Sequence, residues 1–272
     1  MKNLKLKVIL TPPYRNCHCE QSLDCVAIRS GAHPSPTLPV QGERTITKKY
    51  SYGFTLAEVL ITLVIIGVIA AITVPTLIIK HQKEETVTRL KKAYSTLSQT
   101  TARAIADNGP IKTWELGEVT NGNDAYTFVS KYFLPYLNVM KDCKTSTEGN
   151  CSYQAYYLDR TPINISSGSL AKFYLSDGTF VSVQIANSDN RYKFLRVYVD
   201  INGPKKPNLF GKDIFFFCYY VEFNGLFLPA AGELSRTYLL QNCNKNTSEN
   251  AGRYCAALIM KDGWRIADDY PW

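Results

Sequence analysis

The sequence has few of the residues on which hydrolytic active sites and zinc sites depend. Histidine occurs three times in 272 residues, as His18, His33 and His81. All three precede the long C-terminal part that we expect to fold as a domain, so a Ser-His-Asp or Cys-His site cannot form there. The sequence also has no glycine-rich phosphate loop and no paired Cys and His motif of a zinc site. We therefore expect a protein that is not an enzyme.

A basic block interleaved with aromatic residues, typical of nucleic-acid-binding chains, is also missing. The formal net charge is +8. Residues 1–53 hold 8 Lys and Arg against 3 Asp and Glu, which gives +5 and leaves +3 for the rest. Lys48 and Lys49 stand just before a long apolar run, as the positive-inside rule for membrane proteins predicts. We do not expect nucleic acid as a partner.

One uncharged apolar run dominates the sequence, from Val59 to Ile79. A helix needs roughly 20 such residues to cross ~30 Å of hydrocarbon. The run is apolar on every face, whereas the core helix of a soluble protein carries one apolar stripe. Glu58 directly precedes the run, and an unpaired charge at bilayer depth costs about 2.5 to 3.5 kcal/mol. The sequence therefore predicts a membrane-spanning helix in which Glu58 has a cationic partner.

Two simpler interpretations of the run explain fewer of its features. A signal anchor has a basic flank and an apolar run, but gives no reason to place Glu58 at the run's edge. A secretory signal peptide has a shorter apolar core of ~7 to 15 residues and a small-residue cleavage site. Ala70 and Ala71 offer such a site only loosely.

The start of the run resembles the type IV pilin and type II secretion pseudopilin superfamily. The resemblance is carried by Lys48, Lys49, Gly53, Phe54, Thr55, Leu56, Glu58, Gly67 and Pro75. It implies that a membrane peptidase cuts between Gly53 and Phe54 and that Phe54 is then N-methylated. It also implies that Glu58 pairs with the N-terminal ammonium of a neighbouring subunit in a helical filament. Such a pairing would meet the electrostatic requirement of a buried carboxylate.

From this resemblance we expect a prepilin-like structural subunit of a pilus, or of a pseudopilus for type II protein secretion. Its partners would be the prepilin peptidase/methylase, homologous pilin or pseudopilin subunits, and an inner-membrane assembly platform. The chain would cross the inner (plasma) membrane once, with a cytoplasmic N-terminus and a periplasmic or extracellular C-terminal domain. Two alternatives stay open: a minor or tip pilin that binds DNA or a surface, and a single-pass anchored domain that does not assemble.

The resemblance divides the chain into four parts. Residues 1–53 would be a cytoplasmic leader, although leaders of the family are usually short, and a translation start between Thr45 and Lys48 is an alternative. Residues 54–79 would be the transmembrane and assembly half of a long helix, and residues 80–107 its extramembrane half. Residues 108–272 would form a globular α+β pilin-like domain.

The extramembrane half of the helix is predicted by an apolar stripe of period ~3.6. Its members are Val87, Leu90, Tyr94, Leu97 and Ile105. Gly109 and Pro110 end the helix, because glycine favours the C-cap and proline cannot continue a helix. We expect this stripe to pack on the chain's own domain.

The part beyond Pro110 predicts one short helix and then an antiparallel sheet. Apolar residues between Ile111 and Lys141 share one helical face. Five later segments are rich in Tyr, Phe, Val and Ile: 153–158, 170–175, 180–185, 195–201 and 214–222. Ser176-Asp177-Gly178 is a candidate hairpin turn. The expected fold is α+β, a long N-terminal helix packed against one face of a small antiparallel sheet.

Five cysteines lie in the part expected outside the cytoplasm, where disulfides persist. The simplest pairs are local, Cys143 with Cys151 and Cys243 with Cys255. Cys218 would then be a buried thiol on a strand. Sequence alone does not fix the connectivity, so a bond from Cys218 to Cys255 stays open.

The loop from Asp200 to Phe215 resembles a loop of pseudopilin-like proteins. Asp200, Asn202 and Asp213 offer oxygen ligands that suit calcium. Lys205 and Lys206 occupy places where ligands would help, and no terminal bidentate Glu follows. The alternative is a stiff Asx and Pro turn between two strands.

The final residues of the chain are rich in aromatic side chains, with Trp264, Tyr270 and Trp272. Large aromatic side chains seldom lie free in water. We therefore expect the final segment to pack on the domain, and a binding role is the alternative.

Overall fold

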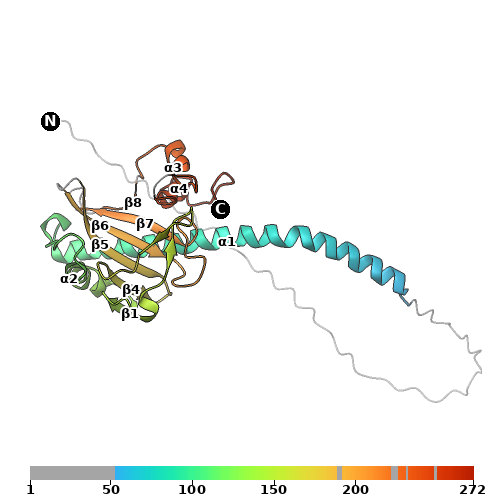
Figure 1. Ribbon diagram of the computed structural model, residues 1–272, viewed down its shortest axis with the longest axis horizontal. Coiled ribbons are helices and arrows are strands. Elements are labelled where there is room, and N and C mark those ends of the chain that lie inside the picture. Colours follow the sequence, from blue (N-terminus) through green and yellow to red (C-terminus); the bar gives the residue numbers. More distant parts are fainter. Residues whose placement is uncertain (1–52, 189–191, 222–225, 231, 248–249) are drawn as a thin grey trace, which may run out of the picture. The chain divides into compact units, whose positions relative to one another are not determined.

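The computed structural model describes residues 53–272, apart from short gaps at 189–191, 222–225, 231 and 248–249 (Figure 1). The leader expected over residues 1–53 therefore lies outside the described residues, except for Gly53. The sequence has three further cysteines in this leader, Cys17, Cys19 and Cys25, and they lie outside the described residues as well.

One helix, α1, runs without a break from Leu56 to Asn108. Its N-cap is Thr55, which forms a capping box with Glu58: each side chain accepts a hydrogen bond from the other residue's backbone N–H. At the other end Gly109, with φ 78°, donates its N–H to the carbonyl of Ile105 and stops the helix. A helix of 53 residues is roughly 80 Å long at ~1.5 Å per residue. The long helix predicted from the sequence is confirmed.

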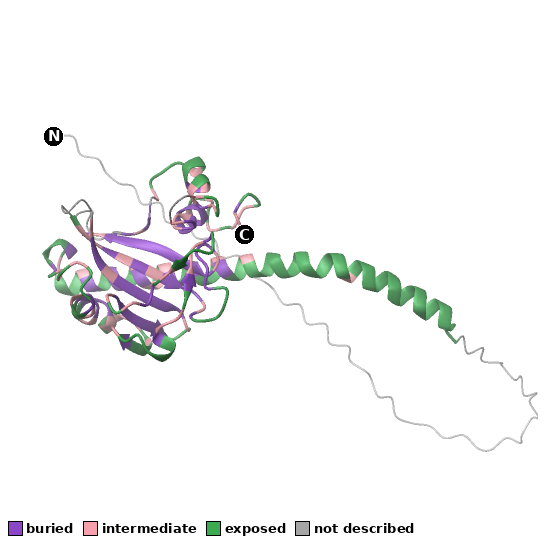
Figure 2. Cartoon of the chain, viewed as in Figure 1, coloured by how far each residue is buried: buried purple, intermediate pink, exposed green. Residues whose placement is uncertain are grey.

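The two halves of α1 differ in burial (Figure 2). Residues 56–82 are exposed except for Ala70, which is partly buried. Farther along, one face is buried, through Thr86, Leu90, Ala93, Leu97, Thr100, Thr101 and Ala104. Val87, Tyr94 and Ile105 flank this face and pack partly buried against the core. The outer half of α1 thus packs on the domain along the predicted stripe.

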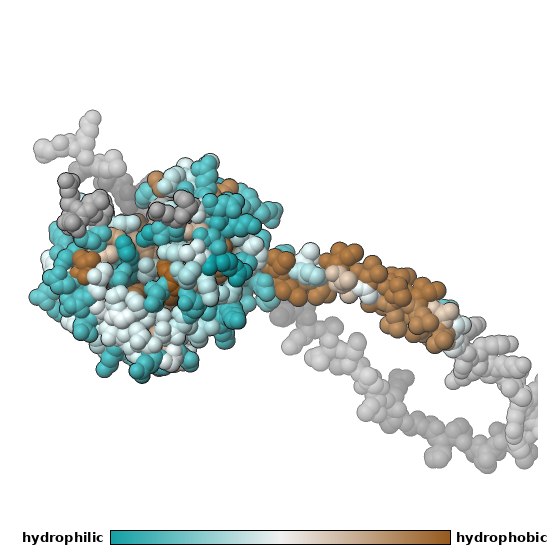
Figure 3. Space-filling view, in the orientation of Figure 1, coloured by the Kyte–Doolittle hydropathy of each residue, from teal (hydrophilic) through white to brown (hydrophobic). Residues whose placement is uncertain are grey.

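The exposed half of α1 is also the most apolar part of the described chain (Figure 3). Among the described residues α1 is the one helix that is long and apolar enough to cross a membrane. Its best window has a mean hydropathy of 2.6 and no buried residue. These properties fit a single-pass membrane-anchored protein.

The domain is built on a six-stranded antiparallel sheet, in the order β1-β4-β5-β6-β7-β8. The strands are β1 Val139–Lys144, β4 Ala171–Leu175, β5 Phe180–Ser188, β6 Tyr192–Asp200, β7 Ile214–Tyr220 and β8 Leu226–Pro229. The predicted hairpin turn joins β4 to β5, where Gly178 donates its N–H to Leu175 and Asp177 accepts from Thr179. A separate two-stranded sheet pairs β2 Ala155–Tyr156 with β3 Pro162–Ile163.

The first face of the sheet packs against α1. Tyr219 on β7 is fully buried there; its hydroxyl accepts a hydrogen bond from Thr101 at 2.8 Å and donates to the carbonyl of Leu97 at 3.2 Å. The ring of Tyr94 lies 5.9 Å from that of Phe217. The antiparallel sheet and its packing on the long helix confirm the predicted α+β class.

The second face of the sheet is covered as well, whereas the sequence led us to expect packing of the long helix against one face and strands that are only half buried. Phe216 and Cys218 on β7 point away from α1 and are also buried. They belong to a second core cluster with Phe210 and with Cys143 and Cys151. The segments around β2, β3 and the 201–213 loop supply this cover. The reason is that two long connections fold back over the sheet, so β7 is buried on both faces from Ile214 to Tyr219.

Short helices complete the domain. The helix expected between Ile111 and Lys141 is α2, Gly122–Tyr132, capped by the side chain of Asn121. The strand expected over 153–158 is reduced to the two residues of β2, outside the main sheet. Near the C-terminus lie α3, Arg236–Asn242, and α4, Cys255–Lys261, which pack on each other (Figure 1).

Candidate functional site

The N-terminal end of α1 presents an accessible extended segment. Gly53, Phe54 and Thr55 have no regular secondary structure, and the side chain of Phe54 is 88% exposed. A methyl group added at Gly53 would meet no atom within 4 Å. The local fold therefore does not require glycine at position 53, and any requirement for it has to come from an enzyme that acts on this junction.

Glu58 is held close to that junction by the capping box. Its Oε2 accepts hydrogen bonds from the backbone N–H and the hydroxyl of Thr55, both at 2.8 Å. The carboxylate thus folds back toward the N-terminus of α1, where the helix dipole favours a negative charge. A cation that approached the start of the helix would meet this carboxylate. Gly67 and Pro75, the other predicted motif residues, lie inside α1.

Residues 48–74 match the model of the prokaryotic N-terminal methylation motif, which is the type IV pilin and pseudopilin signature. The match contains Gly53, Phe54 and Glu58. Residues 76–272 match the model of a family of unknown function (DUF6613). The chain belongs to the DUF6613 family. No curated protein and no solved structure matches the chain.

The two matches meet inside α1, so the methylation motif and the DUF6613 region share one helix. The motif covers the exposed apolar half, whereas the DUF6613 region includes the half that packs on the sheet. The sequence alone predicted the motif. Within the DUF6613 region it showed a general α+β pattern and, from Asp200 to Phe215, a loop that resembles one of pseudopilin-like proteins.

The DUF6613 domain contains two buried disulfides. Cys143 is bonded to Cys151, with their Cα atoms 5.7 Å apart, and Cys243 is bonded to Cys255 at 4.8 Å. The first joins β1 to the segment beyond it, and the second joins the end of α3 to the start of α4. Closing such short loops stabilises a fold by about 2 to 3 kcal/mol each on the chain-entropy model. Cys218 is a buried free thiol, and burial raises its pKa to about 11.

The structure brings the three predicted calcium ligands together. Asp200 and Asp213 are buried, and the amide of Asn202 lies beside them, 3.4 Å from Asp213. Burial, followed by the charge of Asp213, raises the pKa of Asp200 well above its usual range. The carboxylates accept hydrogen bonds from the chain itself: Asp200 from Tyr153 at 2.8 Å, and Asp213 from the backbone of Asn208 at 2.8 Å and of Leu209 at 2.6 Å.

A stiff Asx and Pro turn requires side-chain oxygens that accept hydrogen bonds and hold the loop in place. The carboxylate oxygens of Asp200 and Asp213 accept such bonds. Among the described residues no group of three His, Cys, Asp or Glu could hold a metal ion. The geometry therefore favours the turn, and calcium binding stays a prediction.

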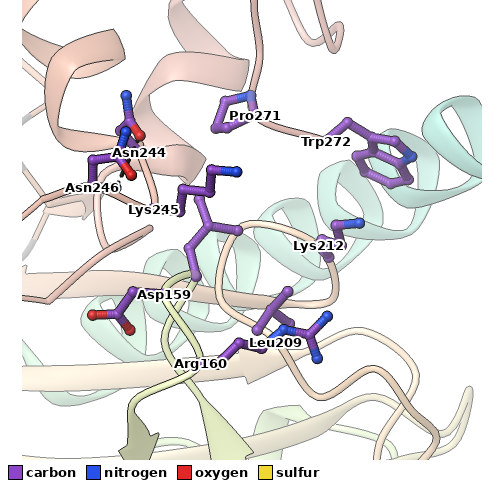
Figure 4. Close-up of a pocket in the computed structure, with 10 residues that line it drawn as sticks. Asp159, Arg160, Leu209, Lys212, Asn244, Lys245, Asn246, Pro271 and Trp272 are labelled. Carbon is purple, nitrogen blue, oxygen red and sulfur yellow. Dashed lines mark hydrogen bonds between the residues drawn. The ribbon is translucent and has the colours of Figure 1, made fainter.

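A surface hollow of about 460 Å³ lies between four segments of the DUF6613 domain (Figure 4). Arg160, Lys212 and Lys245 bring three cationic side chains to it, and Asp159 is its one carboxylate. Trp272 forms one wall, with the ammonium of Lys212 5.4 Å from its ring centroid. Sequence analysis missed this hollow because its cations are far apart along the chain. The arrangement suits an anionic group.

Proposed function

We propose that the chain is a prepilin-like structural subunit that is cut after Gly53, N-methylated at Phe54 and assembled through α1 into a pilus, or into a pseudopilus for type II secretion. One observation carries the proposal: the methylation motif continues into a helix whose residues 56–82 are exposed apart from Ala70. Such an apolar surface needs hydrocarbon or other helices around it. The lipid bilayer supplies the first environment and a helical filament the second.

Glu58 fits both environments. In the membrane its carboxylate lies at the end of the apolar run, where the cost of a charge falls toward the interface. In a filament it would be buried among helices, and the ammonium of a neighbouring Phe54 would neutralise it. The exposed setting of Phe54 leaves that ammonium accessible to another subunit.

The proposed topology follows from charge and from the disulfides. Lys48 and Lys49 keep the N-terminus in the cytoplasm, where the prepilin peptidase/methylase and the assembly platform would act. The domain, with two disulfides, lies on the oxidising side of the membrane. In this proposal the chain is a substrate and a building unit rather than an enzyme.

Processing is the direct test. Mature protein isolated from membranes is expected to begin with N-methyl-Phe54 by intact mass. Gly53→Glu is expected to abolish cleavage, with a loss of mature product of at least roughly ten-fold, because each 1.4 kcal/mol lost at the peptidase site lowers the rate ten-fold. Ser51→Glu places the same charge two residues upstream as the control. Cleavage near Ala71 in the wild type would contradict the proposal.

A minor or tip subunit is the second candidate, and the hollow of Figure 4 favours it. Three cations beside Trp272 suit an anionic surface or DNA as the ligand. Abundance separates the two candidates. A major subunit is made in large excess over a tip protein, which quantitative mass spectrometry of sheared filaments measures.

A further inference from the structure

Two grooves flank α1 at the place where the helix leaves the domain. The first lies between α1 and the C-terminal segment, and Lys80, Lys83, Trp264 and Arg265 are among its lining residues. The second lies between α1 and the 201–213 loop. Its lining includes Lys205, Lys206, Lys212 and Trp272. We call them the juxtamembrane grooves. The chain's C-terminus lies beside α1 in this region (Figure 1).

Helix geometry places the grooves at the level of lipid headgroups. The apolar run ends at Ile79, and Lys80 and Lys83 follow about 1.5 and 6 Å farther along the helix axis. The headgroup layer on each side of a bilayer is roughly 5 to 8 Å thick. When the run spans the hydrocarbon, the first groove therefore opens toward the headgroups on the side of the domain. The second groove begins beside Gln82, about 4.5 Å beyond Ile79, and continues along α1 to Arg89.

The juxtamembrane grooves carry an excess of positive charge. Six cationic side chains that line them take part in none of the ion pairs among the described residues. They belong to Lys80, Lys83, Lys205, Lys206, Lys212 and Arg265. Four carboxylates line them as well: Glu84, Glu85, Asp213 and Asp268. Glu85 is already paired with Arg89 at 2.7 Å, and Asp213 is occupied by the backbone of its own loop.

Each groove is lined by one tryptophan, Trp264 in the first and Trp272 in the second. Trp264 is partly buried, with its ring 5.4 Å from that of Tyr94. Trp272 is also partly buried and lies under the ammonium of Lys212. Tryptophan concentrates at the boundary between hydrocarbon and water, because its ring is apolar and its N–H seeks a polar partner. Basic residues beside it attract anionic headgroups.

We infer that the end of the domain next to the membrane docks on anionic phospholipid, with lipid phosphates received by the juxtamembrane grooves. The inference rests on the proposed function in one respect, namely that α1 spans the membrane before assembly. Docking gives the domain a second membrane contact besides its helix. The domain is then held in one orientation against the bilayer until the subunit enters a filament.

The test uses the full mature chain in lipid nanodiscs made with and without phosphatidylglycerol. A spin label on the lipid headgroup quenches tryptophan fluorescence when the domain docks. We expect stronger quenching with phosphatidylglycerol, and Trp264→Phe should remove part of it. Each basic residue near an anionic surface changes the docking equilibrium by roughly five-fold, so Lys83→Gln with Arg265→Gln should lower it roughly 25-fold.

The matched control is Lys112→Gln with Lys131→Gln, which removes two positive charges near the far end of α1. It should leave quenching unchanged. Equal quenching in both kinds of disc, an equal loss in the control, or release of the domain by inorganic phosphate at constant ionic strength would each overturn the inference. Extraction of vesicles with alkaline carbonate tests the span separately. A released chain contradicts the proposed function, whereas a retained chain without lipid-dependent quenching contradicts the docking alone.

Discussion

Glu58 is the residue whose surroundings would change most if the chain entered a filament, as we propose. In the structure its carboxylate caps its own helix through two contacts with Thr55. The cap accounts for the position of the side chain. The cap alone does not require a charge, because a neutral glutamine could form the same capping box. The helix dipole favours a negative charge there, and in the proposed filament a neighbouring ammonium would neutralise it.

Two variants of Glu58 separate the cap from the charge. We expect Glu58→Val and Glu58→Gln both to insert into the membrane, and both to lose filament assembly by at least ten-fold, because neither can pair with an ammonium. Only Glu58→Gln keeps the cap. Counting sheared filaments by electron microscopy and immunoblotting measures the loss. Normal filaments from Glu58→Gln would show that the charge is not needed.

Lys172 on β4 is a buried cation held by three backbone carbonyls. Its side chain is 1% exposed and its ammonium donates to Thr145, Ser166 and Ser167 at 3.1, 2.9 and 2.8 Å. Burial lowers the pKa of Lys172 from the ordinary 10.5 to about 8. Between these two values the unfolded chain binds more protons than the folded one, so stability rises with pH there.

Lys172→Met is the matched variant, since it keeps an unbranched side chain, shorter by one atom, and removes the titrating ammonium. We expect the free energy of unfolding of the wild type, relative to this variant, to increase from pH 8 to pH 10. The slope for one proton cannot exceed about 1.4 kcal/mol per pH unit. Urea unfolding at several pH values measures it. Taking the difference cancels the opposing titration of Cys218, whose raised pKa lowers stability at high pH in both proteins. A flat or falling difference would refute the lowered pKa.

At the level of elements, the two C-terminal helices are too short to be stable alone, and a disulfide and ion pairs hold them in place. α3 and α4 have seven residues each. The Cys243–Cys255 disulfide joins them, and Arg236 of α3 binds Asp262 at 2.5 Å and Asp269 at 2.8 Å. Helices of this length are unstable alone. Their position therefore depends on oxidation.

Peptide mapping of the exported domain without reductant is expected to find Cys143 linked to Cys151, Cys243 linked to Cys255, and Cys218 free. Cys243→Ser with Cys255→Ser should destabilise the domain by about 2 to 5 kcal/mol, because small exported domains depend on their disulfides to that extent. Cys218→Ser, which removes a thiol without breaking a bond, is the comparison. A Cys218–Cys255 link in the map would contradict the structure.

The elements that sequence analysis missed are those whose stability comes from elsewhere in the fold. β1 is an edge strand with three exposed residues in a row and no alternating pattern. α3 begins at Ser235, a normal N-cap, but it is too short to show a helical period. β4 to β7 were predictable because each is rich in β-branched and aromatic residues. Burial of the second sheet face was not, since it depends on where long loops return.

The residues of the candidate site also form two groups, those that the sequence predicts and those that only the fold brings together. Gly53, Phe54 and Glu58 are consecutive or nearly so, and the motif they form is visible in the sequence alone. The juxtamembrane grooves join Lys83 to Arg265, residues that only the fold brings together. A motif of neighbouring residues can be recognised in the sequence, whereas a surface that combines distant segments can be recognised only in the tertiary structure.

At the scale of the whole molecule, the exposed half of α1 adds nothing to the core of the domain. Residues 56–82 are exposed apart from Ala70, and burial begins near Thr86. A mature chain shortened to begin at Lys80 is therefore expected to fold. Its midpoint of thermal unfolding should stay within about 4 °C of the full chain, the shift that a loss of about 1 kcal/mol would cause.

Calorimetry of the shortened chain without detergent, beside the full chain in detergent, measures this midpoint. Shortening the chain further, to begin at Ala93, removes Leu90 from the core and provides the contrast. Burying a leucine is worth about 2 to 5 kcal/mol, so this second truncation should melt far lower. Equal loss in both would mean that the exposed half of α1 supports the fold.

The unbroken course of α1 has a mechanical consequence. A load that pulls on the domain passes directly into the rod that anchors it, because no hinge or loop lies between Leu56 and Asn108. The face of α1 that is buried in the domain extends from Thr86 to Ala104, about 27 Å along the axis. Force along that axis acts on this contact as shear, so its apolar and hydroxyl contacts are strained together rather than peeled apart one by one. The chain can therefore bear tension along α1 without a flexible joint that would lengthen first.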